Sequence, residues 1–204
     1  MSWRNKVLVF TLAAAAGASP AVAGEIHDFA RSGDLPRVTR LLDSGADLEE
    51  RDATQETPLL SAALAGEVEI VEALIARGAD LMARNDRGLT PLHAAAYSGS
   101  TDAVRLLADA GALVNDAENK FKVTPLIVAA EENHLDIVKL LIENGADIEA
   151  AERHGYTALT RAGFKQREDV IAVLLENGAV CQAEEKVGPG WSAECRKRKS
   201  GGAP

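Results

Sequence analysis

The hydrophobic positions of this chain recur in short blocks that alternate with polar stretches. Within each block, apolar residues are spaced so that they fall on one face of a helix. Each block ends near a glycine, and a mostly polar run such as Asp80–Leu89 follows, which is typical of a turn or hairpin. The pattern therefore predicts short amphipathic helices, each too short to be stable alone in water. The blocks lie at residues 70–75, 104–107, 137–142 and 170–175.

Two sequence markers repeat in step along the chain. The first is Thr-Pro-Leu, with spacings of 33 and 34 residues and an altered fourth copy, Thr157-Ala158-Leu159, after a further 33. The second is Gly-Ala, with spacings of 33, 33, 34 and 33 residues. Two markers that share one period establish an internal repeat. The markers begin at Thr57, Thr90 and Thr124, and at Gly45, Gly78, Gly111, Gly145 and Gly178.

The most regular copy, Thr90–Gly111, reads T-P-L-H-x-A-A-x-x-G, then an apolar helix and a closing Gly-Ala. This unit resembles the ankyrin repeat. The resemblance implies an all-α solenoid of helix-turn-helix units with projecting hairpin fingers. It covers residues 24–180 as about five repeats, including an N-terminal capping repeat over residues 26–48. In that capping repeat, Glu25, His27, Asp28 and Arg31 suit an outer face in contact with water.

The copies differ at particular positions. The glycine of the finger turn is present at Gly88 and Gly155, but is replaced by Gln55 and Lys122 in the other two copies. One extra residue lies between Gly111 and Thr124, so we expect the finger that contains it to differ in shape from its neighbours.

His93 lies at the centre of the most regular copy, where it could be a catalytic residue. In the ankyrin family the equivalent histidine more often bonds to the backbone and joins neighbouring repeats. Leu60, Ile127 and Thr160 occupy the same place in the other copies, which favours a structural role over a reactive one.

The first 23 residues are not part of the predicted fold. Arg4 and Lys6 form a basic start, Val7–Ala16 is apolar, and Ala21-Val22-Ala23 is typical of a cleavage site. Residues 1–23 therefore predict a secretory signal peptide cut after Ala23, and a periplasmic or secreted protein. The alternative, a membrane anchor, is disfavoured because the apolar run is too short to span a bilayer.

Residues 181–204 form a C-terminal extension that follows no repeat pattern. In an oxidising compartment Cys181 and Cys195 can pair, whereas in a reducing one they would be free thiols. We expect a disulfide that holds Val187 and Trp191 over the last repeat as a cap, followed by a disordered basic tail that includes Arg196–Lys199. A fully disordered extension is the alternative.

The chain has 22 Lys and Arg against 31 Asp and Glu, a net charge of −9. Such a surface repels nucleic acid and would attract basic partners. The four histidines are scattered over different repeats, and no catalytic, phosphate-binding or metal-binding motif is present. The sequence thus predicts no enzyme, no metal and no cofactor. The opposing hypothesis, enzyme activity or small-ligand binding through the C-terminal extension, lacks a supporting motif.

The resemblance implies that a partner binds the concave side, formed by the finger tips and the exposed positions of the inner helices. Four of the six aromatic residues after position 23 fall on this face, as is usual for interface anchors. For Tyr97 and Phe164, filling of gaps between helices is the alternative. The candidate binding residues are Arg84, Arg87, Leu89, Tyr97, Lys120, Phe121, Glu131, Arg153, His154, Tyr156, Phe164 and Lys165.

These observations predict an exported, monomeric module that binds another protein, with the periplasm of a Gram-negative bacterium as the expected compartment. An alternative in the same compartment is an immunity or inhibitor protein that protects against, or stabilises, one enzyme. The partner itself is not identified by the sequence.

Overall fold

The computed structural model describes residues 24–201. The predicted signal peptide and its cleavage site lie outside the described residues. Within residues 24–201 the regular structure is helical, apart from one isolated bridge between Ala151 and Thr157. The helices are α1 (Glu25–Arg31), α2 (Leu35–Asp43), α3 (Pro58–Ala65), α4 (Val68–Ala76), α5 (Pro91–Ser98), α6 (Thr101–Asp109), α7 (Pro125–Glu132), α8 (Leu135–Glu143), α9 (Ala158–Phe164), α10 (Glu168–Glu176), α11 (Glu184–Val187) and α12 (Pro189–Lys199).

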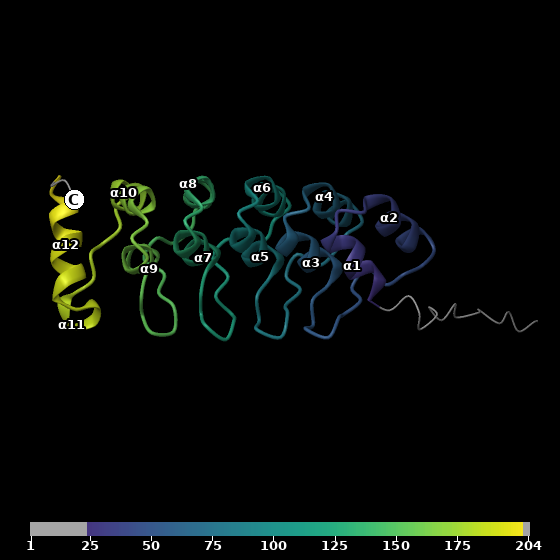
Figure 1. Ribbon diagram of the computed structural model, residues 1–204, viewed down its shortest axis with the longest axis horizontal. Helices are drawn as coiled ribbons and strands as arrows, with labels where there is room; N and C mark the ends of the chain where they lie inside the picture. Colours follow the sequence, from purple (N-terminus) through teal and green to yellow (C-terminus); the bar gives the residue numbers. More distant parts are fainter. Residues whose placement is uncertain (1–23, 202–204) are drawn as a thin grey trace, which may run out of the picture.

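The first ten helices form five consecutive pairs stacked in a single row (Figure 1). The odd-numbered inner helices form one layer, and the even-numbered outer helices form a second layer beside it. Four loops project from the inner layer on the side away from the outer helices. This architecture confirms the all-α solenoid with about five repeats. We call the loops finger 1 (44–57), finger 2 (77–90), finger 3 (110–124) and finger 4 (144–157).

The inner helices begin where the repeated threonine predicts. The side chains of Thr57 and Thr124 accept hydrogen bonds from backbone N–H groups three residues later, and a proline follows each of them. Thr157 caps α9 in the same way although Ala158 replaces the proline. The threonine supplies the acceptor that the first helical turn lacks, so the cap survives without the proline.

The inner helices pack closely because small residues face their neighbours. Each Ala-Ala pair of the repeat has no solvent-exposed surface, and branched residues of the outer helices, such as Val71 and Leu74, fill the space between layers. No helix pair could bury these surfaces alone, so the stability of the stack is a sum over neighbouring pairs. The paired alanines are Ala62, Ala63, Ala95, Ala96, Ala129 and Ala130.

The finger turn keeps one backbone conformation in all four fingers. Gly88 and Gly155 have positive φ angles of 83° and 81°, and Gln55 and Lys122 adopt the same left-handed region at 62° and 54°. A side chain there costs roughly 1–2 kcal/mol relative to glycine. The stack therefore imposes the turn even where the sequence does not favour it.

At the N-terminal end, α1 and α2 form the predicted capping repeat. Glu25, Asp28 and Arg31 are exposed as expected, but His27 is buried. The prediction for His27 was wrong because this residue occupies the same place in its repeat as His93. Its Nε2 lies 2.9 Å from the carbonyl oxygen of Glu56, which is a bond between the first two repeats.

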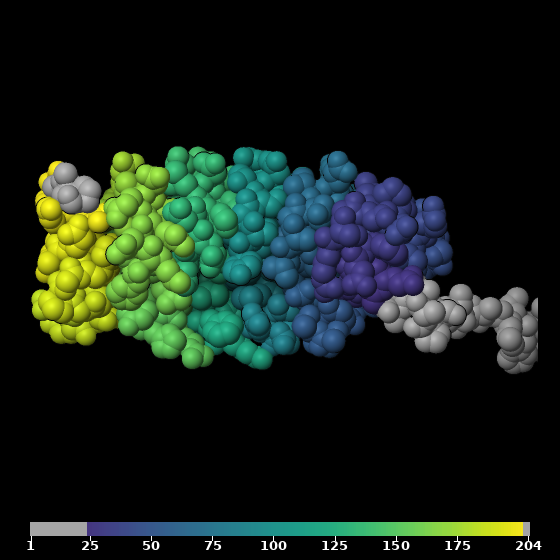
Figure 2. Space-filling model, in the orientation of Figure 1, coloured from purple at the N-terminus to yellow at the C-terminus, as the bar shows by residue number. Residues whose placement is uncertain are grey.

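At the C-terminal end, α11 and α12 lie against the last helix pair (Figures 1 and 2). Cys181 and Cys195 form a disulfide, and Cys195 is fully buried. Trp191 packs on α9, where a methyl group on Gly163 would overlap its indole ring. The extension therefore covers the flank of the last repeat. Val187 is only half-buried and is not among the residues packed on the core, so Trp191 and Cys195 carry this contact.

The basic residues near the C-terminus differ from the expected disordered tail. Arg196–Lys199 form the last turn of α12. Arg198 forms ion pairs with Glu168 and Glu194, and the Nζ of Lys199 donates to the carbonyl oxygen of Ala179 at 3.1 Å. These contacts order the segment because they give two of its four cations partners on the stack. The tail residues after Gly201 lie outside the described residues.

Candidate protein-binding surface

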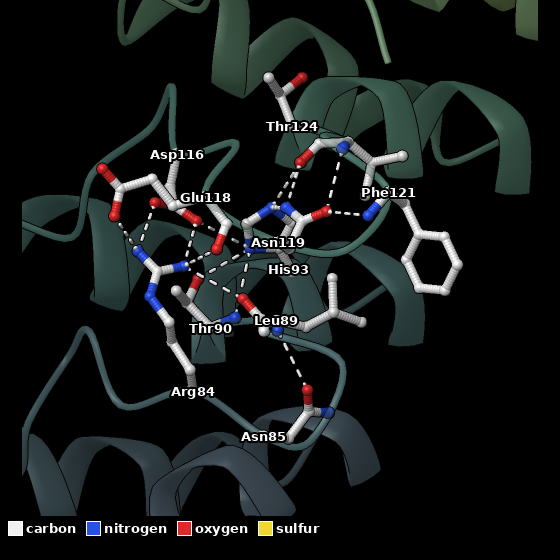
Figure 3. Close-up of polar contacts among 12 residues, drawn as sticks. Arg84, Asn85, Leu89, Thr90, His93, Asp116, Glu118, Asn119, Phe121 and Thr124 are labelled. Carbon is white, nitrogen blue, oxygen red and sulfur yellow. Dashed lines mark hydrogen bonds and ion pairs between the residues drawn. The ribbon is translucent and has the colours of Figure 1, made fainter. Parts of the chain in front are cut away.

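His93 has the predicted structural role. Its ring is 1% exposed, Nδ1 lies 2.8 Å from the hydroxyl oxygen of Thr90, and Nε2 lies 3.0 Å from the carbonyl oxygen of Val123 (Figure 3). Burial lowers the pKa of His93, so the ring is neutral, with Nε2 donating to Val123 and Nδ1 accepting. Its hydrogen-bonding capacity is used, and it joins α5 to finger 3.

Arg84, a candidate binding residue, is held inside the stack instead. Its guanidinium bonds both carboxylate oxygens of Asp116 at 2.7 and 2.9 Å, and reaches the carbonyl oxygens of Gly88 and Glu118 at 3.1 and 3.2 Å (Figure 3). Burial acts to raise the pKa of Asp116, but the bonds and charge of Arg84 outweigh it and lower that pKa. This ion pair joins fingers 2 and 3 and leaves little of Arg84 for a partner.

The extra residue of finger 3 lies beside this ion pair. Asp116 N–H bonds to the carbonyl oxygen of Leu113, as at the equivalent turn of finger 2, whereas Asn119 lies one position late relative to Asn85. The insertion is therefore between Asp116 and Asn119. It lies next to the guanidinium of Arg84, which bonds the carbonyl oxygen and the carboxylate of Glu118.

Glu131 and Lys165 are also joined within the stack. A carboxylate oxygen of Glu131 accepts a bond from Arg161 Nη2 at 2.6 Å, and Lys165 Nζ lies 3.6 Å from the other oxygen. Arg167 Nε donates to the Glu131 carbonyl oxygen at 3.1 Å. The side chain of Glu131 thus links α7 to α9, while Lys165 remains about half exposed.

A hollow of about 340 Å³ lies between fingers 1–3 and the inner helices α3, α5 and α7. We call it the finger groove. Its apolar wall consists of Leu64 from α3, Tyr97 from α5, Val128 from α7, and residues of fingers 2 and 3. Tyr97 is 57% exposed and Phe121 39% exposed, so neither serves mainly to fill the core. The finger residues of the wall are Leu89, Phe121 and Val123.

The remaining candidate aromatic residues form a second group, on α9 and finger 4. The rings of Tyr156 and Phe164 meet edge to face with centroids 5.2 Å apart, and Phe164 is 46% exposed. His154 lies beside Tyr156 and bonds the carboxylate of Glu152 at 3.0 Å. The Arg153 guanidinium lies 5.8 Å from the centre of the Phe121 ring and connects the two groups. Gap filling does not account for Tyr97 or Phe164.

Neighbouring finger tips are tied by backbone hydrogen bonds. The N–H of Asp86 donates to Thr54 at 3.0 Å, that of Lys120 to Arg87 at 3.1 Å, and that of Arg153 to Phe121 at 2.9 Å. These bonds hold the tips in a continuous row, so a partner meets a surface that is ordered before binding.

The structure thus divides the candidate residues into two sets. Arg84 and Glu131 hold the repeats together; of the other ten, eight lie on the fingers or in the groove, and Phe164 and Lys165 lie at the end of α9. Sequence reasoning missed Val128 as a groove residue, although its place in the repeat is that of Ala94, which also lines the groove. Among the residues that the structure describes, no cluster of metal-ligating side chains occurs, and no helix is long and apolar enough to cross a membrane.

A family model described as ankyrin repeats (3 copies) matches residues 26–117 and 112–185. The chain belongs to the ankyrin-repeat family. Domains of this family are typically non-enzymatic modules that bind other proteins. A search of curated proteins finds no match to the chain. In this ankyrin-repeat protein, the candidate protein-binding surface is therefore defined by the finger groove and the row of tips.

Proposed function

We propose that this ankyrin-repeat protein is exported and binds a partner protein in the finger groove, with Tyr97 and Phe121 as anchors. The observation that carries the proposal is the exposure of these two rings beside the aliphatic side chains of one groove. Large exposed aromatic side chains over an apolar hollow are the usual composition of an interface centre.

Export is supported by the disulfide of the C-terminal cap. Cytosolic thiols are normally kept reduced, whereas Cys181 and Cys195 are paired. Cell fractionation with N-terminal sequencing tests this part: we expect the protein in the periplasm or medium, beginning at Gly24. A cytosolic protein with residues 1–23 retained would overturn it.

A photo-crosslinking residue in place of Tyr97 tests the binding site in cells. The captured protein is purified, and its affinity is measured for the unmodified protein and for the double variant Tyr97→Ala/Phe121→Ala. We expect binding about 100-fold weaker, because each anchor contributes roughly tenfold or more. The melting temperature should be unchanged, because both side chains are largely exposed.

The matched control removes two other exposed apolar side chains, Leu113 and Val180, which lie outside the groove. Leu113→Ala/Val180→Ala should bind as the unmodified protein does. Equal affinity of both double variants for the captured protein would refute the groove as the binding site.

A further inference from the structure

The finger tips carry a charge opposite to that of the whole protein. Four exposed cations lie on the tips of fingers 2–4, and within the described part of the chain none of them is in a salt bridge. By contrast, Arg31 contacts three carboxylates and Arg84 contacts two. The four are Arg87, Lys120, Lys122 and Arg153.

The backbone bonds between the tips bring these cations into one row. Lys120 is bonded directly to Arg87, and Arg153 to Phe121, whose neighbours on both sides are lysines. The row therefore runs along the stack from finger 2 to finger 4, and Phe121 lies within it. Two exposed acids lie on the same fingers, Asp86 at the tip of finger 2 and Glu118 in finger 3, and Glu118 is paired with Arg84.

The excess of negative charge lies elsewhere. Exposed carboxylates such as Glu72, Asp102 and Asp136 are on the outer helices, on the opposite side of the stack from the tips (Figure 1). Salt at physiological strength screens exposed charges beyond about 8 Å. A ligand at the tips therefore experiences mainly the local cations.

We propose that the row of tip cations and the finger groove together bind an acidic, extended segment of a partner protein. Carboxylates of the segment pair with Arg87, Lys120, Lys122 and Arg153, and an apolar side chain enters the groove beside Tyr97. The inference rests on the proposed function and gives the chemistry of the partner. It reverses the expectation, drawn from net charge alone, that basic partners are preferred.

Three features favour an acidic protein segment. Arginine presents a planar fork that matches a carboxylate. The groove is walled by aliphatic groups of Leu64, Leu89 and Val128, which suit an aliphatic side chain. The row is short and the rest of the surface is acidic, so a long polyanion such as nucleic acid would be repelled beyond the row.

Selection from a random twelve-residue peptide library displayed on phage tests the inference with the purified full-length protein. We expect the selected peptides to be enriched in Asp and Glu together with Leu, Ile or an aromatic residue. Their binding, measured by fluorescence anisotropy, should weaken as salt is raised.

Two charge-reversed variants with equal net charge provide the matched comparison. Arg87→Glu/Lys120→Glu changes the tips, and Arg105→Glu/Lys139→Glu changes exposed, unpaired positions on α6 and α8. We expect the tip variant to bind the selected peptides about tenfold more weakly or worse, and the outer-helix variant to differ little from the unmodified protein. Equal losses of peptide affinity in both variants would mean that the peptides respond to the overall charge of the protein rather than to the tip cations. This result would overturn the inference.

The remaining outcomes separate this inference from the proposed function. Neutral or basic selected peptides that are lost on Tyr97→Ala would overturn the acidic partner and leave the groove as the site. If the unmodified protein enriches no peptides beyond those that the Tyr97→Ala/Phe121→Ala protein enriches, both the acidic partner and the groove as binding site are overturned. A single-stranded oligonucleotide that displaces the peptides, and that loses affinity on tip reversal, would show a nucleic-acid ligand and also overturn the inference.

Discussion

At its N-terminal end the stack is covered by α1 and α2, which are a shortened copy of the repeat. At its C-terminal end it is covered by α11 and α12, which have no counterpart among the repeats. The first end is held by hydrogen bonds and ion pairs, including those of Arg31 with Asp52 and Glu56. The second end also has polar contacts, such as the ion pair of Arg198 with Glu168, and in addition it has Trp191 and the disulfide between Cys181 and Cys195.

Both ends nevertheless complete the same type of contact at one place in the repeat. His27 and His93 each bond a carbonyl oxygen of the next repeat. Thr160 has no next repeat, and its hydroxyl donates to the side-chain oxygen of Gln182 at 2.6 Å. The amide nitrogen of Gln182 in turn donates to the carbonyl oxygen of Gly155 at 2.7 Å. The side chain of Gln182 thus supplies the hydrogen-bond acceptor that the backbone of a following repeat would otherwise provide.

The comparison teaches that the end of a solenoid needs hydrogen-bond partners for its polar groups and a cover for its apolar flank. Different residues can meet these two needs at the two ends. It also predicts different weaknesses. The C-terminal end should depend on oxidation, and the N-terminal end on ionised carboxylates.

Loss of the disulfide should have the largest effect. Cys181→Ser/Cys195→Ser opens a loop with a sequence separation of 14, and we expect the free energy of unfolding to fall by about 3 kcal/mol in the chain-entropy model. Urea unfolding with and without a thiol reductant measures this. The reductant should reproduce the loss in the unmodified protein and have no effect on the variant; an unchanged midpoint would contradict a disulfide-held cap.

Gly163→Ala should displace the C-terminal cap without touching its cysteines. The added methyl group overlaps the Trp191 ring, and overpacking of this kind costs about 1–3 kcal/mol. Tryptophan fluorescence should shift toward that of an exposed ring. Gly190→Ala is the control, because a Cβ there meets nothing within 4 Å. Equal stability of the two variants would show that the packing of Trp191 on α9 does not require a glycine at position 163.

Asp52→Asn should weaken the N-terminal end in a pH-dependent way. Burial acts to raise the pKa of Asp52, but bonds from Thr54, the backbone of Glu56 and Arg31 lower it from 3.8 to about 2. The folded-state pKa is depressed, so this stabilisation is present above about pH 4 and is lost as the pH falls toward 2.

At neutral pH we therefore expect Asp52→Asn to reduce the free energy of unfolding by about 1–2 kcal/mol. Below pH 4 the variant and the unmodified protein should converge, as measured by urea unfolding at a series of pH values. Reductant should lower the stability of both proteins equally, because the two ends are distant. A constant difference down to pH 2 would exclude the titration of Asp52 as the cause.

The period of the repeat was enough to predict the architecture, because the Thr-Pro start and the Gly-Ala stop each have a local physical cause. The cap could also be predicted: Trp191, Cys181 and Cys195 follow the last repeat, whose flank must be covered. Burial of His27 was missed although its place in the repeat matches that of His93, because the capping repeat lacks Thr-Pro-Leu.

The division of the candidate site could not be predicted in the same way. Arg84 and Arg87 are both finger cations, and only the contact with Asp116 of the next finger shows that Arg84 is engaged and Arg87 is not. Net charge hides the basic row as well, since it averages the tips with the outer helices. Which charges are paired depends on contacts between neighbouring repeats. The sequence of a single repeat does not show these contacts, because they arise only when the repeats stack.

The cap formed by Gln182 and Trp191 also bears on assembly. The flank of a last repeat resembles the surface that each internal repeat presents to the next one. An uncovered flank can therefore bind the first repeat of another copy of the chain. Head-to-tail contacts of this kind lead to rings when the rotation closes and to filaments when it does not. By occupying this flank, Trp191 and Gln182 remove that acceptor surface at the C-terminal end of the stack.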